Sequence, residues 1–514
     1  MMDLAIIGSG FGGTLMAMVA RSFGLSVVLL EKSSHPRFVI GESSTPLADL
    51  LWLELTQAHG LTSLAPFAKW GTWRRAHPEV ACGLKRGFTF YGHKAGEPFA
   101  AAEDRSDQLL VGASPRDEVA DTHWFREEFD HFLVREAQRL GVDYFDHCDV
   151  QEVSVGTGGA RISARHNGGV REFQSRFVID ASNQRGPLSR SLGLAELPLP
   201  HLPPTQGLYT HFRNVARLGQ LPLHPGIEKA PFPIDDAAVH HVFEGGWIWV
   251  LRFVNGVTSA GVAATDAAAT RLGLHEGAAG WERLLGELPT VARQFAKAET
   301  VQPWVYAPRL SFRTGPAAGP GWALLPSAAG FVDPLLSSGF TLTLLGIERL
   351  AAALRDHWKS PDGLTAALGS YAVETTADML ALEKFIAALY ARLGDFPAFT
   401  EIARLYFCAV IHCETTRRLG RPGDSGGFLM RNHPEFAADA NACCDAAIAG
   451  EPTPSLRARV DALLKKFDLG GLEDETRRPW YPVMADDLRR CRGRVGASES
   501  EVESLLRRSG LVPG

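Results

Sequence analysis

Three glycines near the N-terminus have the spacing of a site that holds a pyrophosphate. Gly8, Gly10 and Gly13 end the apolar run "LAIIGSGFGG", and a stretch with one apolar helical face follows them. Glycines at this spacing permit a tight turn and let N–H groups at a helix start approach phosphate oxygens. A second apolar run, "LSVVLLEK", brings Glu31 to its end, where a carboxylate can accept hydrogen bonds from ribose hydroxyls. A glycine turn that only packs a helix on a sheet would not need this acid, so the order predicts a dinucleotide site.

Lys85 is a second residue whose surroundings suggest chemistry. It lies in "ACGLKRGFTFYGH" (81–93), and two-residue alternation puts it on one strand face with Gly83 and Gly87. Glycine in a strand often marks a place where something approaches the backbone closely. A lysine buried there would have a lowered pKa and could act as an amine. The alternative is an edge-strand lysine that discourages aggregation.

A strand with two tryptophans is a candidate binding wall. The stretch "HHVFEGGWIWVLRF" places Trp247 and Trp249 on one face. Such a face is either a core strand or one side of a site for a flat aromatic guest. His240 and His241 fall on opposite faces with no third ligand nearby in the sequence, so we expect structural roles for them and no metal site.

A serine loop offers a seat for an anion. The loop "FVDPLLSSGF" ends in Ser338 and Gly339 and leads into the helical pattern "TLTLLGIERLAAAL". A helix start exposes unpaired N–H groups and a partial positive charge. These residues could therefore hold an anion or the polar edge of a flavin.

The bulk properties indicate a large soluble protein. A chain of 514 residues, 45% hydrophobic and 21% charged, predicts two or three interlocked domains. The net charge of -6 gives no reason to expect nucleic acid or an anionic membrane as partner. The seven cysteines form no CxxC pair, and Cys443 is adjacent to Cys444, which favours reduced thiols in the cytoplasm. The first strand begins near Leu4, which leaves no room for a signal peptide.

The order of motifs resembles the flavoprotein monooxygenase superfamily, whose members bind FAD through separated segments of one fold. "RFVIDAS" ends a strand at Asp180, and "GWALLPSAAGFVDP" adds a strand, a small-residue turn and Asp333. Arg126, in "HWFREEFD", matches the arginine that such proteins place near the FAD phosphates. The resemblance implies that these three residues take part in cofactor binding. Where the family has Gly-Asp, this chain has Pro326–Ser327, so the usual carboxylate contact to the ribityl chain is missing and we expect FAD to exchange easily.

The fold class that this resemblance implies is α/β. We expect a Rossmann-like FAD-binding domain of the flavoprotein monooxygenase type, with an inserted substrate-side β-sheet and a mainly helical C-terminal region. Residues 1–345 would form the FAD-binding domain, interleaved with the substrate-side sheet at about 80–120 and 200–310. From about residue 345 the pattern becomes helical, so 346–514 would form a second domain that covers the substrate pocket.

A narrower resemblance, to the flavin-dependent halogenases, covers nearly the first 350 residues. "GESSTP" at 41–46 resembles that family's GE(S/A)xxP segment. The tryptophan strand resembles its WxWxIP signature, with Leu251 in the next matching place and Arg252 replacing the proline. The serine loop resembles its halide-binding loop, and Lys85 falls where the family keeps its essential lysine. The flanking glycines would then leave room for an oxidant and a substrate.

The resemblance implies a reaction as well. A separate NAD(P)H-dependent flavin reductase would supply reduced FAD, and oxygen with chloride or bromide would yield hypohalous acid. An internal tunnel would carry this oxidant to Lys85, which would hold it as a chloramine or by hydrogen bonding. An electron-rich aromatic ring would then be halogenated at carbon. The backbone amides of Ser338 and Gly339 would bind the halide.

Leu336 predicts the substrate class. Tryptophan halogenases that resemble this chain have a glutamate at the corresponding place, where a carboxylate can orient the oxidant and stabilise charge on the ring. Leucine can do neither, so the substrate must be activated on its own account, as a phenol is. Trp247, Trp249 and Leu336 would line the tunnel or the substrate pocket.

Other functions on the same fold remain open. An FAD-dependent aromatic monooxygenase would share the FAD segments but would need neither Lys85 nor the serine loop. A flavin dehydrogenase or reductase acting on isoprenoid-like substrates is a second alternative. A flavin-binding redox protein without halogenation activity is a third, favoured by the altered Pro326–Ser327 and Arg252 positions. The sequence leaves open the substrate, the halide and whether a carrier protein presents the substrate.

Overall fold

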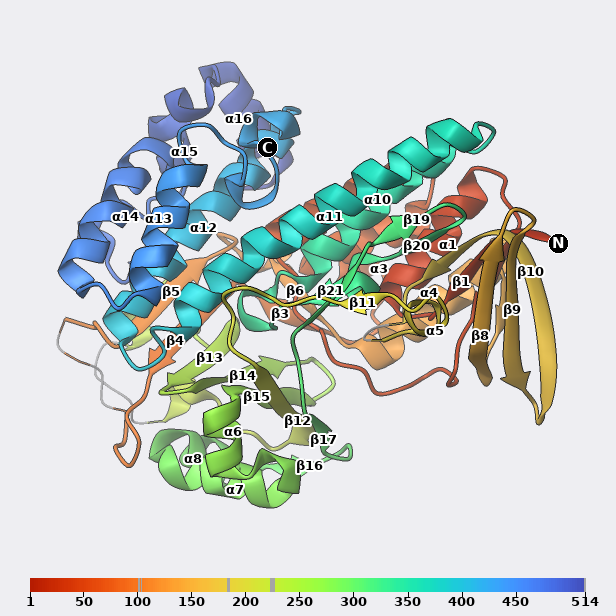
Figure 1. The fold of residues 1–514 in the computed structure, drawn as a ribbon. Helices are drawn as coiled ribbons and strands as arrows, with labels where there is room; N and C mark the ends of the chain where they lie inside the picture. The colour runs from red at the N-terminus through yellow and green to blue at the C-terminus, as the bar shows by residue number, and fades with distance from the viewer. Residues whose placement is uncertain (100–101, 103, 183–184, 222–226, 513–514) are drawn as a thin grey trace.

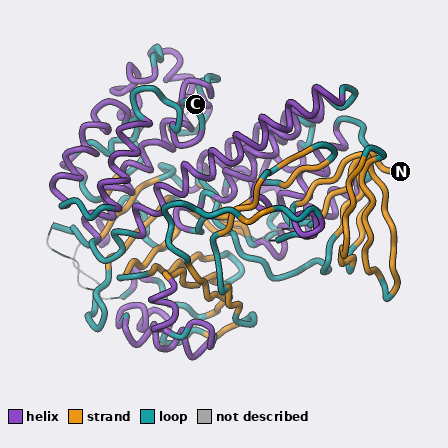
Figure 2. Tube along the Cα trace, viewed as in Figure 1, coloured by secondary structure: helices purple, strands orange, loops and turns teal. Residues whose placement is uncertain are grey.

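Two large sheets and a group of long helices form the protein (Figure 1). The computed structural model describes residues 1–99, 102, 104–182, 185–221 and 227–512. The strands gather in two regions, and most of the helices of the second half of the chain lie together (Figure 2).

The first sheet is the nucleotide-binding type that the glycine motif predicts. Strand β1 (Met2–Ile7) pairs in parallel with β2 (Val27–Leu30) and with β10 (Gly169–Asp180), and helix α1 (Phe11–Ser22) connects β1 to β2. The apolar runs of β1 and β2 are almost entirely buried, as parallel strands covered on both faces must be. The remaining strands of this sheet are β19 (Ala318–Gly319), β20 (Trp322–Leu324) and β7 (Asp143–Phe145), with the hairpin β8 (Cys148–Gly156) and β9 (Gly159–His166).

The second sheet separates two hydrophobic clusters. On β14 (Gly246–Arg252), Trp247 and Trp249 join the main core on one face. On the other face, Ile248 and Val250 share a cluster with residues of the helices α6 (Asp266–Leu272), α7 (Ala278–Glu287) and α8 (Pro289–Phe295). This alternation is the two-residue period of a strand. The other strands of this sheet are β16 (Glu299–Thr300), β12 (Thr205–Arg213), β15 (Thr258–Thr265), β13 (Ala238–Phe243), β4 (Gly87–Gly92), β5 (Gln108–Gly112), β22 (Trp480–Tyr481) and β17 (Val305–Ala307).

Long helices dominate from residue 339 onward. Helices α10 (Gly339–His357) and α11 (Pro361–Tyr390) cross the middle of the molecule, and α12 (Phe396–Arg418) leads into the C-terminal group (Figure 1). That group contains α13 (Ala437–Ile448), α14 (Thr453–Phe467), α15 (Ala485–Cys491) and α16 (Glu499–Arg508). Among the described residues one helical segment, Leu335–His357, is long and apolar enough to cross a membrane, and 67% of its most apolar window is buried inside the fold.

Shorter elements complete the described chain. The remaining helices are α2 (Pro46–Ala58), α3 (Trp70–Ala76), α4 (Arg126–Arg139), α5 (Pro187–Ser191), α6 (Asp266–Leu272), α7 (Ala278–Glu287), α8 (Pro289–Phe295) and α9 (Pro326–Ala329). The remaining strands are β3 (Cys82–Lys85), β6 (Asp121–Trp124), β11 (Ala195–Glu196), β18 (Phe312–Gly315) and β21 (Gly330–Phe331).

The stretch that contains Lys85 forms two strands rather than one. Strand β3 pairs with β6 in a two-stranded ribbon, while β4 belongs to the second large sheet. The chain changes partner at Arg86, whose backbone N–H donates to the carbonyl of Asp236 at 2.6 Å. Lys85 therefore lies at the end of the ribbon, where the two units meet.

The two glycines beside Lys85 make room for other segments of the protein backbone and not for a ligand. A Cβ atom added to Gly83 would lie 2.0 Å from the carbonyl oxygen of Arg252, and one added to Gly87 would lie 2.3 Å from that of Val111. The expectation that these glycines leave room for an oxidant and a substrate is therefore wrong. They let other backbone segments of the protein approach the ribbon and the second sheet closely, and Lys85 is buried between them.

We expect Gly83→Ala to lower the free energy of unfolding by about 1–3 kcal/mol, because the new methyl group would force the Arg252 backbone to move. Gly156→Ala is the matched control, since a Cβ there meets nothing within 4 Å. Denaturant unfolding of both variants measures the effect. Equal stability of the two variants would contradict the packing described here.

Candidate active site

A cavity of about 770 Å³ lies at the carboxyl ends of β1 and β2. We call it the larger cavity. Ligands of open α/β sheets bind at this edge, and the volume falls within the roughly 300–1,000 Å³ typical of small-molecule sites. Residues from distant parts of the chain line it, including Gly8, Gly10, Glu31, Arg37, Arg126, Ser182, Trp247, Trp249, Asp333, Ser338 and Gly339.

The predicted glycine turn forms one end of the larger cavity. Gly8 has φ +98°, a conformation that favours glycine, and a Cβ on Gly13 would lie 2.0 Å from the Gly8 carbonyl oxygen. These two glycines are needed for the turn itself. A Cβ on Gly10 would instead point toward the guanidinium of Arg126, with its nearest contact at 3.4 Å. Helix α1 begins here without a side-chain cap, so its N–H groups face the cavity as a phosphate site requires.

Glu31 follows β2 and contacts the glycine turn. Its carboxylate accepts hydrogen bonds from the Ser9 backbone N–H at 3.0 Å and from the Ser9 hydroxyl at 2.8 Å. Burial opposes ionisation, but the nearby Arg37 and the hydrogen bonds from Ser33 and Ser9 hold the pKa of Glu31 below its ordinary value. A carboxylate that stays ionised suits an acceptor for ribose hydroxyls.

The three other predicted cofactor residues have different positions. Arg126 lines the larger cavity and is held by Asp130 through hydrogen bonds of 2.7 and 2.8 Å. Asp180 lies behind the cavity wall and accepts from the Ser182 N–H at 2.9 Å, so Ser182 rather than Asp180 contacts the cavity. Asp333 does line the cavity.

Asp333 is tied to the C-terminal helices. Its carboxylate accepts a hydrogen bond from the Tyr390 hydroxyl at 2.7 Å and one from the Leu335 N–H at 2.9 Å. Burial raises the pKa of Asp333 to about 7. Trp247 donates its indole N–H to the same Tyr390 oxygen at 3.2 Å. Tyr390, at the end of α11, has no motif around it in the sequence, so only the fold reveals this link.

The serine loop turns sharply before α10. Leu336 and Ser337 have φ values of 68° and 56°, in the left-handed region that L-residues seldom adopt. Ser338 and Gly339 follow at the start of α10 and line the larger cavity. The Ser338 hydroxyl is buried and has no hydrogen-bond partner among the described residues, and a Cβ on Gly339 would meet none of their atoms within 4 Å. The loop therefore presents polar groups to the cavity as an anion seat would.

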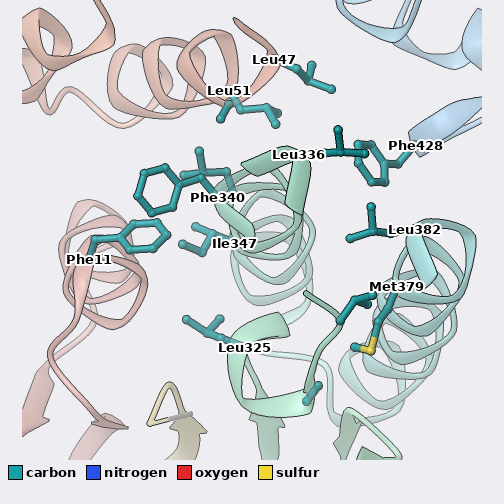
Figure 3. Close-up of a cluster of buried hydrophobic side chains, with 14 of the residues drawn as sticks. Phe11, Leu47, Leu51, Leu325, Leu336, Phe340, Ile347, Met379, Leu382 and Phe428 are labelled. Carbon is teal, nitrogen blue, oxygen red and sulfur yellow. The ribbon is translucent and has the colours of Figure 1, made fainter. Parts of the chain in front are cut away.

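A smaller cavity of about 140 Å³ lies on the other side of the serine loop. We call it the smaller cavity. Leu336 faces it and lies beside Phe428, with Leu47 nearby (Figure 3). Its walls are largely apolar and come mainly from α2, β4, α12 and the C-terminal group. The residues that line it include Phe88, Tyr406, Phe407 and Leu506, and also Lys69 at the start of α3. None of these five residues was indicated by the sequence, because they meet only through long-range packing.

Two short segments divide the two cavities. Glu42 and Ser43 line the larger cavity, and Thr45 to Leu47 line the smaller one. In the same way Ser337 to Phe340 line the larger cavity, whereas Leu336 and Thr341 line the smaller one. The hydroxyls of Thr45 and Thr341 are hydrogen bonded at 3.1 Å and join the segments. We call residues 42–47 and 336–341 the partition.

Lys85 lies against this partition. Its ammonium or amine group donates to the carbonyl of Ser44 and lies 3.8 Å from the centre of the Phe88 ring, which lines the smaller cavity. His240, which interacts electrostatically with Lys85, lines the larger cavity. The side chain of Lys85 is fully buried, which excludes the edge-strand alternative. Burial lowers the pKa of Lys85 to about 7, although Asp121 and Asp49 oppose the shift.

The other residues singled out by the sequence have structural partners. His241 is hydrogen bonded to His93 and to Gln294, both at 2.9 Å. Arg252, in place of the signature proline, forms an ion pair with Asp235 at 3.3 Å. Pro326 and Ser327 line the larger cavity at the start of α9.

The chain has curated relatives that are halogenases. It is 28% identical over 424 residues to the tetracycline 7-halogenase of Kitasatospora aureofaciens, covering 80% of this chain and 73% of that protein. It is 27% identical over 505 residues to the monodechloroaminopyrrolnitrin halogenase PrnC of Pseudomonas fluorescens, covering 91% and 85%. No protein-family model matches the chain.

The fold is shared with a solved halogenase. The crystal structure of halogenase PltM in complex with phloroglucinol and FAD superposes with a TM-score of 0.83 at 23% identity, covering 94% of this chain and 99% of that one. These relatives confirm the predicted α/β fold class, the resemblance and the classification as an oxidoreductase. By sequence and by fold, the chain is a relative of the flavin-dependent halogenases.

Proposed function

We propose that the protein is an FAD-dependent halogenase that acts on an electron-rich, phenolic substrate in the cytoplasm. The observation that carries this proposal is the position of Lys85, which is buried and bonded to Ser44 of the partition between a cofactor-sized cavity and an apolar cavity. A hydroxylase of the same fold would have no use for an amine at that place. The names of the relatives support the same reaction class.

FAD would occupy the larger cavity. The start of α1 and Arg126 would hold its phosphates, and Glu31 would accept from a ribose. Reduced FAD, supplied by a separate NAD(P)H-dependent reductase, would reduce oxygen to the peroxide level, and the peroxide would take two electrons from chloride or bromide to give hypohalous acid. Ser338 and Gly339 would bind the halide at the start of α10, where the helix dipole favours an anion. Pro326–Ser327 offers no carboxylate to the cofactor, which suits a flavin that must exchange with the reductase.

The Lys85 amine would hold the oxidant at the substrate. A neutral amine attacks the halogen of hypohalous acid, forming an N–halogen bond and releasing water. A ring carbon then takes the halogen, the N–halogen electron pair returns to nitrogen, and the ring loses its proton. The Ser44 carbonyl and the Phe88 ring fix the amine in place for both steps. A pKa of about 7 keeps a large share of the amine neutral at physiological pH.

The smaller cavity suits one aromatic ring. Its volume of about 140 Å³ is close to the roughly 150 Å³ of an apolar cavity that admits benzene. Phe88, Phe407 and Leu336 offer flat or apolar contacts. Leu336 supplies no carboxylate to stabilise charge on an indole, so the ring itself must donate electrons. A phenol, and still more a phenolate, does so at its ortho and para carbons.

The central experiment combines the protein with reduced FAD, oxygen, bromide or chloride and a panel of phenols. Mass spectrometry should detect a halogenated ring, and no product should form when halide is omitted. A hydroxylated ring would favour the aromatic monooxygenase alternative. Binding of FAD without any ring product would favour a redox protein without turnover.

We expect Gly10→Ala to weaken FAD binding by at least about tenfold, because its methyl group would face the guanidinium groups of Arg126 and Arg37, which line the larger cavity. The fold should survive, since no backbone atom lies within 3.4 Å of that methyl. Quenching of flavin fluorescence measures the affinity, and circular dichroism checks the fold. Wild-type affinity in a folded variant would remove the glycine turn from the FAD site.

We expect Lys85→Met to bind FAD and to consume oxygen when reduced flavin is supplied, yet to lose carbon halogenation. Methionine nearly preserves the buried volume but cannot hold the oxidant. Oxygen uptake and ring halogenation are measured in the same reaction. Loss of FAD binding would make Lys85 structural, and unchanged halogenation would exclude it from the mechanism.

We expect a phenol to be halogenated faster than free tryptophan when both are offered together. The reason is Leu336, which leaves an indole without a stabilising carboxylate. Product ratios from chromatography with mass detection give the answer. Faster, clean monohalogenation of tryptophan would show that the inference from Leu336 is wrong.

A further inference from the structure

Lys85 has a carboxylate directly across the ribbon that it does not use. In the antiparallel register of β3 and β6, Lys85 is the partner of Asp121. Side chains opposite each other on such strands are neighbours, and a lysine and an aspartate there would ordinarily pair. Yet the Lys85 nitrogen donates to the Ser44 carbonyl, and no carboxylate of the described chain lies within 4 Å of it.

Asp121 is held instead by Lys69. The Lys69 nitrogen lies 3.1 Å from one oxygen of Asp121 and 3.8 Å from one oxygen of Asp49. Both carboxylates are fully buried. Burial and the neighbouring Asp121 raise the pKa of Asp49 well above its ordinary value. Lys69 is thus the cation that pairs with both acids.

The other titratable groups near Lys85 are neutral. His123 on β6 and His240 on β13 both interact electrostatically with Lys85. Burial lowers the pKa of each imidazole well below its ordinary value. The acids that interact with Lys85 are Asp121 on β6 and Asp49 on α2, and Lys69, at the start of α3, pairs with both of them.

On the halogenase function proposed above, we propose that Lys69 is a positioning residue: by pairing with Asp121 it keeps that carboxylate from becoming the counter-ion of Lys85. Lys85 is thereby left as the amine that hypohalous acid needs. Lys69 also lines the smaller cavity, so the residue that controls Lys85 lies beside the substrate.

The chemistry explains why the counter-ion matters. An amine has a lone pair with which to take the halogen from hypohalous acid, and water leaves with the oxygen. An ammonium group has no such pair. A carboxylate within about 4–6 Å of Lys85 and without another partner would favour the ammonium form.

The test measures the charge of Lys85 directly. Protein labelled with 13C at the lysine side-chain carbon next to nitrogen is titrated by NMR, and Lys85→Met assigns the resonance. The wild-type midpoint is expected near 7. In Lys69→Met it should rise by about one pH unit or more, because Asp121 then takes Lys85 as its partner. In a plot of halogenation rate against pH, the acidic limb should move to higher pH by the same amount.

Three variants separate this role from a structural one. Lys69→Arg keeps the charge and should leave the midpoint near the wild-type value. Arg418→Met removes another cation of the smaller cavity, one whose partner is Glu414 at 2.7 Å, and should cause no shift. In Lys69→Met combined with Asp121→Asn the rise should disappear. Lys69→Gln replaces Lys69→Met if the methionine variant does not fold.

An unchanged Lys85 midpoint in folded Lys69→Met or Lys69→Gln would overturn the proposal. A rise that persists in the double variant would also overturn it, because Asp121 would not be the new counter-ion. The NMR readout needs no turnover. If the midpoints shift as expected while the wild type halogenates nothing, the coupling stands and the proposed function fails.

Discussion

A buried lysine amine with no counter-ion of its own in the described part of the chain is the constraint on which the candidate site depends. Taking an ammonium ion out of water costs several kcal/mol, so the protein must either pair it or let it lose a proton. The Lys85 surroundings favour the second course. Its nitrogen has a carbonyl and an aromatic ring as neighbours. Ser44 immediately precedes Thr45, the residue that caps the N-terminus of helix α2 at Pro46. The positive end of this helix therefore lies near the Lys85 nitrogen and disfavours a positive charge on it.

The C-terminal helices complete the site from a distance in sequence. Tyr390 of α11 links Asp333 of the serine loop with Trp247 of the second sheet. Tyr406 and Phe407 of α12 form part of the smaller cavity, with residues of α16 beyond them. A tail that shows no motif thus shapes both cavities, and on the proposed function substrate specificity could change there without any change in the cofactor segments.

Local patterns were predictable from the sequence, and long-range contacts were not. The glycine turn and Glu31 follow each other within one strand-helix-strand unit, so their spacing is enough to place them. The position of Lys85 was indicated by the family resemblance, but the purpose of its flanking glycines was misjudged because Arg252 and Val111 approach them from distant segments. The single strand expected at 81–93 is two, since its halves pair with different sheets.

Asp180 shows a further limit of a match in sequence order. A strand end predicts where such a residue lies but not which way its carboxylate points, and the turn after β10 captures it. Lys69 could not have been identified as a site residue from the sequence. The sequence around it shows no motif, and its proposed role depends on Asp49 and Asp121, which only the fold brings next to it.

The left-handed turn at Leu336 and Ser337 makes one loop serve two compartments. Successive residues face opposite sides, Leu336 toward the smaller cavity and Ser337 toward the larger one. On the function proposed above, halide choice and substrate choice would therefore not be independent traits for an engineer or for natural selection. A replacement that enlarges the seat for bromide would shift the wall against which the ring rests, and a library that varies this loop would have to be screened for both properties at once.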